Sequence, residues 1–380
     1  MIEPVRIGVP LVAVALASGL HAQRSPQIVS RDLGTVTSFD TRFRVEVVAE
    51  GLIVPVGLAF LPDGGLLVAE RAIGRLSIFD LRRGTITAVE GVPEARQHDD
   101  AGLLDVLVHP DFAHNHLLYL AYSAESAGIS TTAVDRARLD GRRLVERTRL
   151  FTARPFVDSD FHYGGRLVLR DGYLFITVGD RERRGFAQDL SVDNGKIIRL
   201  REDGRIPEDN PFVNQKGALP EIWSYGHRNP QGLTLHPVTR ALWEDEHGPR
   251  GGDEVNLIEG GKNYGWPVIT YGHEYEGGPV GEGLVAHEGM ERPVYYYTPS
   301  IAPSGMAFYS GDALSAWKGN LFIGGMGLRH LNRLIMQGDT VVGEERLLRN
   351  FRWRVRVVRQ GPDGWLYLGV DEGMLVRLRP

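Results

Sequence analysis

The sequence predicts an all-β fold, a six-bladed β-propeller of four-stranded antiparallel blades. Three observations support this prediction. A turn-and-strand pattern recurs six times along the 380 residues, glycine and proline are abundant at 47 and 21 residues, and no long stretch shows helical periodicity. Repeated small antiparallel units of this kind are typical of propellers. A β-sandwich or two small β domains is the alternative.

The six repeats share one design. An apolar strand leads into a turn, and a second run of β-forming residues follows, often ending in an acidic residue or glycine. The turn and second strand of the six repeats read "LPDGGLLVAE" (61–70), "HPDFAHNHLLYLAYS" (109–123), "LRDGYLFITVGD" (169–180), "HPVTRALWEDEHG" (236–248), "AWKGNLFIGG" (316–325) and "GPDGWLYLGVD" (361–371).

The first 22 residues are typical of a secretory signal peptide. Arg6 precedes an apolar run from Ile7 to Leu20, and a cleavage site fits after Ala22. The run is short for a transmembrane helix. We therefore expect a periplasmic or secreted protein with no membrane span in the mature chain. The remaining residues are expected to form a linker over 23–44 and one propeller domain over 45–380.

The composition narrows the possible partners. The formal net charge of −5 gives no support for a nucleic-acid partner. The chain has no cysteine, so an exported form would depend on packing and ions rather than on disulfides. We expect a monomer or a homodimer.

Three of the hairpins carry unusual polar residues at the end opposite their turn. In the third, the turn centres on Asp171, and His162 and Asp180 each lie nine residues from it. Antiparallel pairing then brings His162 and Asp180 to the same open end, where Asp180 can orient the imidazole. The equivalent pairs in the fourth and sixth hairpins are Asn229 with Gly248 and Arg354 with Glu372. A propeller gathers these ends on one face, so we predict a polar site there.

Longer motifs resemble the glucose/sorbosone dehydrogenase family, and within it the soluble aldose sugar dehydrogenases that use pyrroloquinoline quinone (PQQ). The motifs are "HYGGRLVL", "GHRNPQGL", "EHGPRGGDEVNLI", "GKNYGWP", "APSGMAFY" and "RQGPDGWLYL", and the resemblance covers roughly residues 45 to 380. It implies a six-bladed propeller that oxidises aldose sugars at C1 to lactones. It also implies PQQ and calcium as cofactors and an external electron acceptor such as a quinone, a cytochrome or a dye.

The resemblance assigns roles to individual residues. It implies that His162 accepts the proton of the anomeric hydroxyl while hydride passes to the quinone, a role that suits an imidazole whose pKa lies near neutrality. Guanidinium groups suit the three carboxylates of PQQ, because they form bidentate, charge-assisted hydrogen bonds. The implied cofactor contacts are Asp100, Arg228, Asn229, Tyr275, Arg354 and Arg356.

The resemblance also implies two calcium ions. The main-chain carbonyls of Gly248 and Pro249 would hold one ion against the cofactor, and backbone oxygens are normal ligands for this hard cation. Glu254 and Tyr264 match a second, structural calcium site.

Two positions depart from the family pattern. Asp100 stands where a glutamine is expected, and Gly327 stands where a lysine is expected, with Arg329 nearby. We therefore expect weakened PQQ binding. Two other functions remain open for this fold: a calcium-dependent propeller hydrolase, such as a lactonase, and a binding propeller without catalytic activity.

Overall fold

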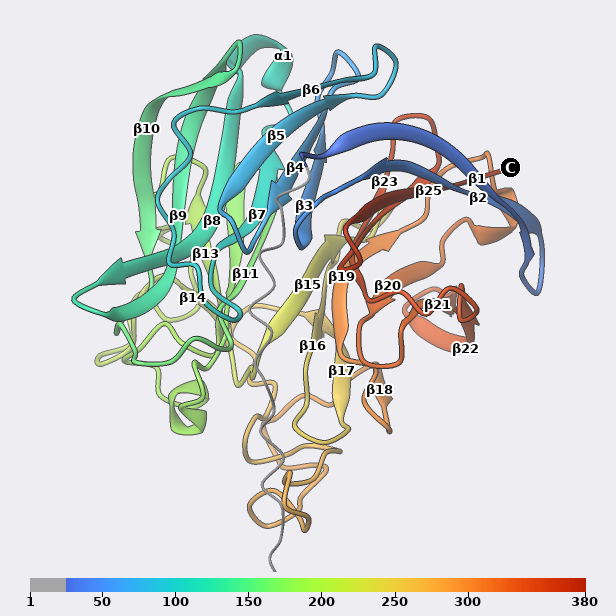
Figure 1. The fold of residues 1–380 in the computed structure, drawn as a ribbon. Coiled ribbons are helices and arrows are strands. Elements are labelled where there is room, and N and C mark those ends of the chain that lie inside the picture. Colours follow the sequence, from blue (N-terminus) through green and yellow to red (C-terminus); the bar gives the residue numbers. More distant parts are fainter. Residues whose placement is uncertain (1–24) are drawn as a thin grey trace, which may run out of the picture.

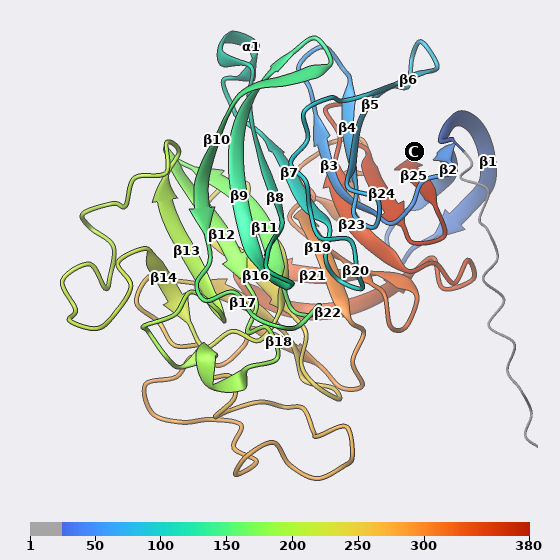
Figure 2. The same cartoon turned by 60° about the vertical axis from the view of Figure 1, so that its left-hand side comes forward.

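Six antiparallel sheets surround a common axis in the computed structural model, which describes residues 25–380 (Figures 1 and 2). Five sheets have four strands and the sixth has five. The predicted six-bladed β-propeller is confirmed, and the alternatives of a sandwich or two β domains are excluded. The predicted signal peptide, residues 1–22, lies outside the described residues.

Each blade runs outward from an inner strand that lines the axis. The first three blades consist of β3 (Pro55–Phe60), β4 (Leu66–Glu70), β5 (Arg75–Asp80) and β6 (Thr85–Ala88); of β7 (Leu103–Val108), β8 (Leu117–Ser126), β9 (Ile129–Asp140) and β10 (Arg143–Thr152); and of β11 (Gly164–Arg170), β12 (Tyr173–Val178), β13 (Lys196–Arg201) and β14 (Ile222–Tyr225). The next two consist of β15 (Pro230–Leu235), β16 (Leu242–Glu246), β17 (Asp253–Ile258) and β18 (Tyr295–Tyr297); and of β19 (Pro303–Phe308), β20 (Leu321–Gly325), β21 (His330–Gln337) and β22 (Thr340–Leu347). The last consists of β23 (Val355–Gln360), β24 (Leu366–Val370), β25 (Met374–Arg379), β2 (Arg42–Glu50) and β1 (Gln27–Thr37). The helical segments are α1 (Phe112–Asn115) and the 3₁₀ turns η1 (Arg184–Ala187) and η2 (Ser315–Trp317).

Each of the six predicted hairpins forms the inner strand and the second strand of one blade. The second strands β4, β16, β20 and β24 are buried along their whole length. Both faces of such a strand pack against neighbouring blades, which explains why β4, β20 and β24 read as largely apolar runs rather than as alternating ones, whereas β16 carries buried acidic residues. None of the helical segments in residues 25–380 has the length or the apolar character that a membrane span requires.

Both ends of the described chain meet in the last blade. Residues 27–44, which were expected to belong to a linker, instead form β1 and the beginning of β2, and β2 pairs with the C-terminal strand β25 (Figure 1). Phe43, Val45 and Val47 of β2 are fully buried in the core of this blade. The pairing covers the edge of β25, which would otherwise present unpaired backbone groups, and it ties the two ends of the ring together.

The two faces of the ring differ. The connection between β7 and β8, which contains α1, lies on one face, and the long segment 259–294 between β17 and β18 projects from the opposite face (Figures 1 and 2). We call the second face the site face, because the open ends of the inner hairpins lie on it.

Every inner strand carries a β-bulge near the site face. The register between the inner strand and the second strand shifts once in each blade, at Val56, Leu104, residues 165–166, Gln231, Gly305 and Arg356. A bulge leaves one residue without a partner in the ladder, so the carbonyls of these residues need other donors.

Arg166 of β11 supplies donors to the bulge carbonyls at the axis. Its Nε lies 2.6 Å from the Gln231 carbonyl oxygen, and its Nη1 lies 2.6 Å from that of Val56. Longer contacts of 3.5 Å reach the carbonyls of Leu104 and Arg356. The side chain is 4% exposed, and burial lowers its pKa to about 10. One guanidinium therefore joins the inner strands of five blades.

Candidate active site

The third hairpin brings His162 and Asp180 together. Its ladder pairs Gly164 with Val178, and just beyond the ladder His162 Nδ1 lies 2.7 Å from Asp180 Oδ1. Because Nδ1 faces a carboxylate, it carries the proton when the ring is neutral, and Nε2 is left with a free lone pair. No hydrogen bond from residues 25–380 reaches Nε2.

The Asp180 carboxylate forms hydrogen bonds with three residues. Besides His162, its carboxylate accepts hydrogen bonds from Trp266 Nε1 at 2.8 Å and from the backbone N–H of Glu182 at 2.9 Å. Burial raises the pKa of Asp180, but the hydrogen bond and charge of His162, the charge of Arg228 and the Trp266 bond outweigh it, so the pKa lies below its ordinary value. Asp180 therefore stays ionised and stabilises a protonated His162.

Arg354 and Arg356 converge on one carboxylate. Arg356 donates to both oxygens of Asp371, at 2.6 and 2.7 Å, and Arg354 Nε donates to Asp371 Oδ2 at 3.0 Å. Arg354 was expected to lie opposite Glu372. The bulge at Arg356 shifts the register by one residue, and Asp371 N–H donates to the Arg354 carbonyl instead.

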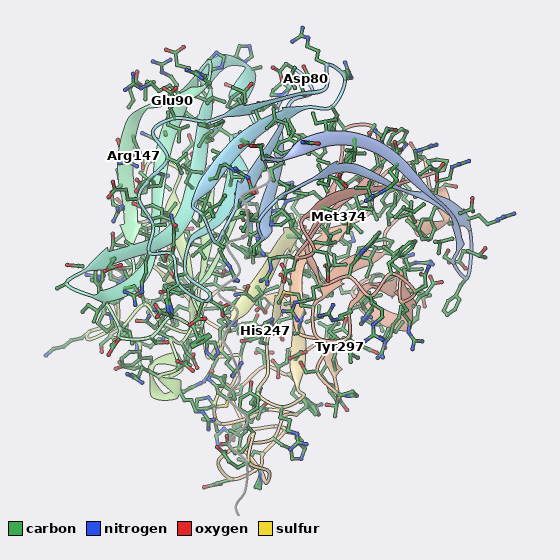
Figure 3. The ribbon with its side chains drawn as sticks, viewed as in Figure 1. Asp80, Glu90, Arg147, His247, Tyr297 and Met374 are labelled. Atoms are coloured by element: carbon green, nitrogen blue, oxygen red, sulfur yellow. The ribbon has the colours of Figure 1, made fainter. Side chains whose placement is uncertain are left out.

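The fourth hairpin shows the same one-residue shift. Asn229 was expected to lie opposite Gly248, but the bulge at Gln231 places it opposite His247, whose N–H donates to the Asn229 carbonyl at 3.2 Å. His247 lies in the middle of the molecule rather than at its rim (Figure 3). Its Nε2 lies 2.7 Å from the Pro303 carbonyl, and burial lowers its pKa.

Arg228 lies beside this pair. It is 8% exposed, its Nη1 donates to the Gly248 carbonyl at 2.9 Å, and its guanidinium carbon lies 5.3 Å from the centre of the Trp266 ring. Trp266 therefore contacts both Asp180 and Arg228, and the third and fourth blades share one site.

Arg71 is a site residue that the sequence analysis missed. Its Nη1 lies 3.0 Å from Asp100 Oδ1, and its Nε is buried without a hydrogen-bond partner. Burial and the neighbouring charge of Arg356 lower the pKa of Arg71 to about 10. A signal was present in the sequence, because Arg71 directly follows the second strand of its blade, as Asp371 does.

The charges at this end of the axis suit an anionic ligand. Four guanidiniums lie with three carboxylates, so one positive charge is in excess; the groups are Arg71, Arg228, Arg354, Arg356, Asp100, Asp180 and Asp371. The residues present therefore fit PQQ, because a polycarboxylate can take the donors that remain free, such as Arg71 Nε.

A cavity of about 770 Å³ has a wall that includes Pro249, His273, Tyr275 and Ser300, and none of these seven charged groups lines it. Tyr275 belongs to the 259–294 segment and is 63% exposed, so it lies on the cavity wall and outside the packed arginine cluster. This volume is large enough for a small-molecule ligand.

The two departures from the family pattern have different surroundings. Asp100 is paired with Arg71, whereas Gly327 offers no side chain. Arg329 does not replace the missing lysine at the arginine cluster. It donates to Glu372 and to the Arg352 carbonyl, each at 3.2 Å.

The two carbonyls expected to hold a calcium ion differ in the hydrogen bonds that they accept. The Gly248 carbonyl already accepts a hydrogen bond from Arg228, whereas the Pro249 carbonyl accepts none from residues 25–380. An ion at this position would share the Gly248 oxygen with a guanidinium.

A cluster of buried acidic residues lies on the fourth blade. The ladder pairs Glu244 with Asn256 and Glu246 with Glu254, so all four side chains leave the same face of the sheet. Ligand atoms of Glu244, Glu246 and His227 lie within 4.8 Å of one another. Glu244 Oε1 and Asn256 Oδ1 are buried without hydrogen-bond partners. Burial and the charge of Glu246 raise the pKa values of Glu244 and Glu254 well above the ordinary range.

This cluster fits a hard divalent cation. Three buried carboxylates cannot all be ionised without a compensating charge, and oxygen ligands of this kind suit calcium. The expected ligand Glu254 is part of the cluster. Tyr264 stacks on His227 with 4.8 Å between ring centres, but its hydroxyl donates to the Leu257 carbonyl. The sequence analysis missed Glu244, Glu246 and Asn256; the signal was the two-residue spacing within "WEDE" and "DEVN".

Fold and site together define a β-propeller enzyme with a largely buried histidine–aspartate pair near a cluster of arginines. The chain belongs to the glucose/sorbosone dehydrogenase family, whose model matches residues 52–377, and it is an oxidoreductase. It is 43% identical over 346 residues to aldose sugar dehydrogenase YliI of Escherichia coli (strain K12), covering 88% of this chain and 92% of that protein.

Two solved structures are also similar to this chain in sequence and fold. The soluble aldose sugar dehydrogenase of Escherichia coli in its apo form is 42% identical, with a TM-score of 0.86 over 89% of this chain and 99% of the other. The PQQ-bound aldose sugar dehydrogenase of Streptomyces coelicolor is 27% identical, with a TM-score of 0.72 over 93% of this chain and 98% of the other.

Proposed function

We propose that this chain is a PQQ- and calcium-dependent dehydrogenase that oxidises aldose sugars at C1 to lactones and passes the electrons to an external acceptor. The His162–Asp180 pair beside four arginines carries the proposal. The Escherichia coli relative, named an aldose sugar dehydrogenase, and the PQQ-bound Streptomyces structure support the substrate class and the cofactor. The proposal includes export to the periplasm or the medium, with residues 1–22 as signal peptide.

Bound PQQ would supply the acceptor for the hydride that leaves C1 of the sugar. His162 Nε2 takes the proton of the anomeric hydroxyl, so C1 and its oxygen form the carbonyl of the lactone. Asp180 holds the ring in the tautomer that leaves Nε2 free and stabilises the imidazolium that forms. Arg71, Arg228 and Arg356 bind and orient the cofactor carboxylates.

Reconstitution tests this function directly. The purified protein is mixed with PQQ in the presence of calcium, and the quinone absorbance and glucose-dependent reduction of a dye are recorded. We expect a bound quinone spectrum and dye reduction. Lactone hydrolysis without PQQ would point to the propeller hydrolase, and ligand binding without turnover would point to a binding propeller.

Calcium is proposed to bind at two places: at the Gly248 and Pro249 carbonyls, and in the buried cluster of Glu244, Glu246, Glu254 and Asn256. Chelation is expected to abolish activity and to lower the melting temperature. An ion that binds only the folded state stabilises it by about 2.7 kcal/mol at 100 times its dissociation constant. Thermal melts during calcium titration measure the effect.

Two variants locate the stabilising ion. Glu244→Gln removes one buried carboxylate and is expected to reduce the calcium-dependent rise in melting temperature. Glu146→Gln changes an exposed carboxylate paired with Arg138 and is expected to leave the rise intact. If chelation changes neither activity nor melting temperature, the two-site assignment is wrong.

Asp100→Gln is expected to bind PQQ more tightly, by roughly tenfold, which corresponds to about 1.4 kcal/mol. The substitution removes a negative charge near an anionic ligand and frees Arg71 from its ion pair. Calorimetric titration of the two apo-proteins with PQQ measures the difference. Equal or weaker binding by the variant would mean that the Arg71–Asp100 pair itself supports the cofactor.

A further inference from the structure

The segment that carries His162 is held by a buried arginine on the neighbouring strand connection. Arg181 is 0% exposed. Its Nη1 donates to the Phe161 carbonyl and its Nη2 to the Ser159 carbonyl. Nη2 also lies 3.0 Å from Ser130 Oγ, and the guanidinium carbon lies 3.5 Å from the centre of the Tyr163 ring.

The backbone of His162 needs such support. His162 has a φ of 56°, in the left-handed region that is unfavourable for a residue with a Cβ. Such conformations persist only where the surrounding structure enforces them. Arg181 holds the carbonyl directly before His162, and Thr132 Oγ1 donates to the Tyr163 carbonyl directly after it, at 2.6 Å. The backbone on both sides of His162 is therefore fixed.

Burying a guanidinium at position 181 lowers the free energy of unfolding relative to a neutral side chain of the same size. Its hydrogen bonds go to carbonyls and a hydroxyl rather than to a carboxylate, and its Nε is buried without a partner. The charges of Asp160 and Glu182 act on Arg181, but neither carboxylate is hydrogen-bonded to it, and a buried charge without a hydrogen-bonded opposite charge is expensive. A neutral side chain would fill the space at lower cost, which favours a role in the site over a role in stability.

We propose that Arg181 is a positioning residue of the reaction, which fixes the backbone of His162 while Asp180 fixes its ring. Asp180 and Arg181 are consecutive, so one short segment orients both the side chain and the main chain of the base. The inference rests on the proposed role of His162. Without Arg181, the imidazole would sample other positions, and Nε2 would be aligned with the sugar hydroxyl for only part of the time.

The test is Arg181→Met, which keeps length and apolar contact and removes the donors. We expect kcat to fall by about 100-fold, the size of effect that a 1 Å misplacement of a reacting group produces. The KM for the sugar and the calorimetric PQQ affinity are expected to stay near those of the original protein. In Arg181→Ala, free guanidinium at a non-denaturing concentration is expected to restore part of kcat, and Arg181→Lys is expected to be intermediate.

Arg333→Met is the matched control. Arg333 is also buried, donates to Glu345 and Asp40, and lies 6.0 Å from the Trp317 ring, away from the site. Its loss is expected to lower the melting temperature and leave kcat unchanged. If Arg181→Met and Arg333→Met lower kcat equally per folded molecule, or if guanidinium does not raise the kcat of Arg181→Ala, Arg181 has a structural role only.

A second variant covers the case in which Arg181→Met does not fold. Ser130→Ala removes one partner of Nη2 and is expected to lower kcat several-fold at unchanged PQQ affinity; unchanged kcat in both Ser130→Ala and Arg181→Lys would overturn the inference. His162→Ala separates the two hypotheses. If it retains turnover, the role of His162 fails and the positioning role of Arg181 fails with it; if it loses turnover while Arg181→Met does not, only the positioning role fails. Absence of PQQ-dependent dye reduction by the original protein would instead overturn the proposed function.

Discussion

His162→Ala is expected to lower kcat by about 100- to 10,000-fold, the contribution of a positioned general base, while PQQ binding and the melting temperature change little. The side chain is 15% exposed and contacts Asp180 rather than the arginine cluster, so its removal leaves the groups proposed to bind the cofactor in place. Steady-state dye reduction with several aldoses measures kcat, and calorimetry measures PQQ affinity.

His114 offers a matched control. It also pairs with an aspartate, Asp111, but it lies in α1 on the face opposite the site and is exposed. His114→Ala is expected to keep the original kcat. Near-normal turnover of His162→Ala with any aldose would remove His162 from the mechanism.

Arg166→Met is expected to lower the free energy of unfolding by about 3–5 kcal/mol, the usual effect of removing one partner of a buried ion pair. Arg166 donates to inner-strand carbonyls across the axis, and its Nη1 lies 3.9 Å from Asp105, which is fully buried. Each carbonyl left without a donor adds about 1–3 kcal/mol. Since whole domains are stable by only about 5–15 kcal/mol, the variant is expected to be close to unfolding.

Urea unfolding followed by tryptophan fluorescence measures the loss. Arg170→Met, on the same strand, removes a half-buried arginine that lies away from the axis, over the Phe175 ring, and is expected to have a much smaller effect. Adding Asp105→Asn to Arg166→Met is expected to recover part of the loss, because it removes a buried charge whose remaining partner is Arg359 at 3.8 Å. Equal losses for Arg166→Met and Arg170→Met would show that Arg166 does not join the blades.

The hairpins were predictable because their signals are local. A turn such as "PDG" and a run of β-forming residues on each side define two paired strands from about 20 neighbouring residues. His162 and Asp180 also meet, but the ladder centres between Asp171 and Gly172, and the bulge at residues 165–166 supplies the half-step that brings them opposite each other. The closing strands β1 and β2 were missed, because β2 joins the sheet through β25, which lies more than 300 residues away in the chain, and β1 pairs with β2.

The one-residue errors at Asn229 and Arg354 have one cause. Counting outward from a turn assumes an uninterrupted ladder, whereas each inner strand carries a bulge. Nothing within a single hairpin requires the bulge. Its free carbonyl is stabilised by Arg166 from another blade, so the register near the site depends on the closed ring.

The sequence by itself determined the class of fold, the six inner hairpins and the face on which the polar residues gather, because strands and turns are encoded by near neighbours. Only the tertiary structure decided which of those residues meet. Arg71 lies among the arginines of the last blade, Trp266 joins Asp180 to Arg228, and Glu244 and Asn256 complete the acidic cluster around Glu254. These contacts join blades or adjacent strands whose relative positions exist only after the ring has closed, and their energies come from burying charges together, which no local pattern records.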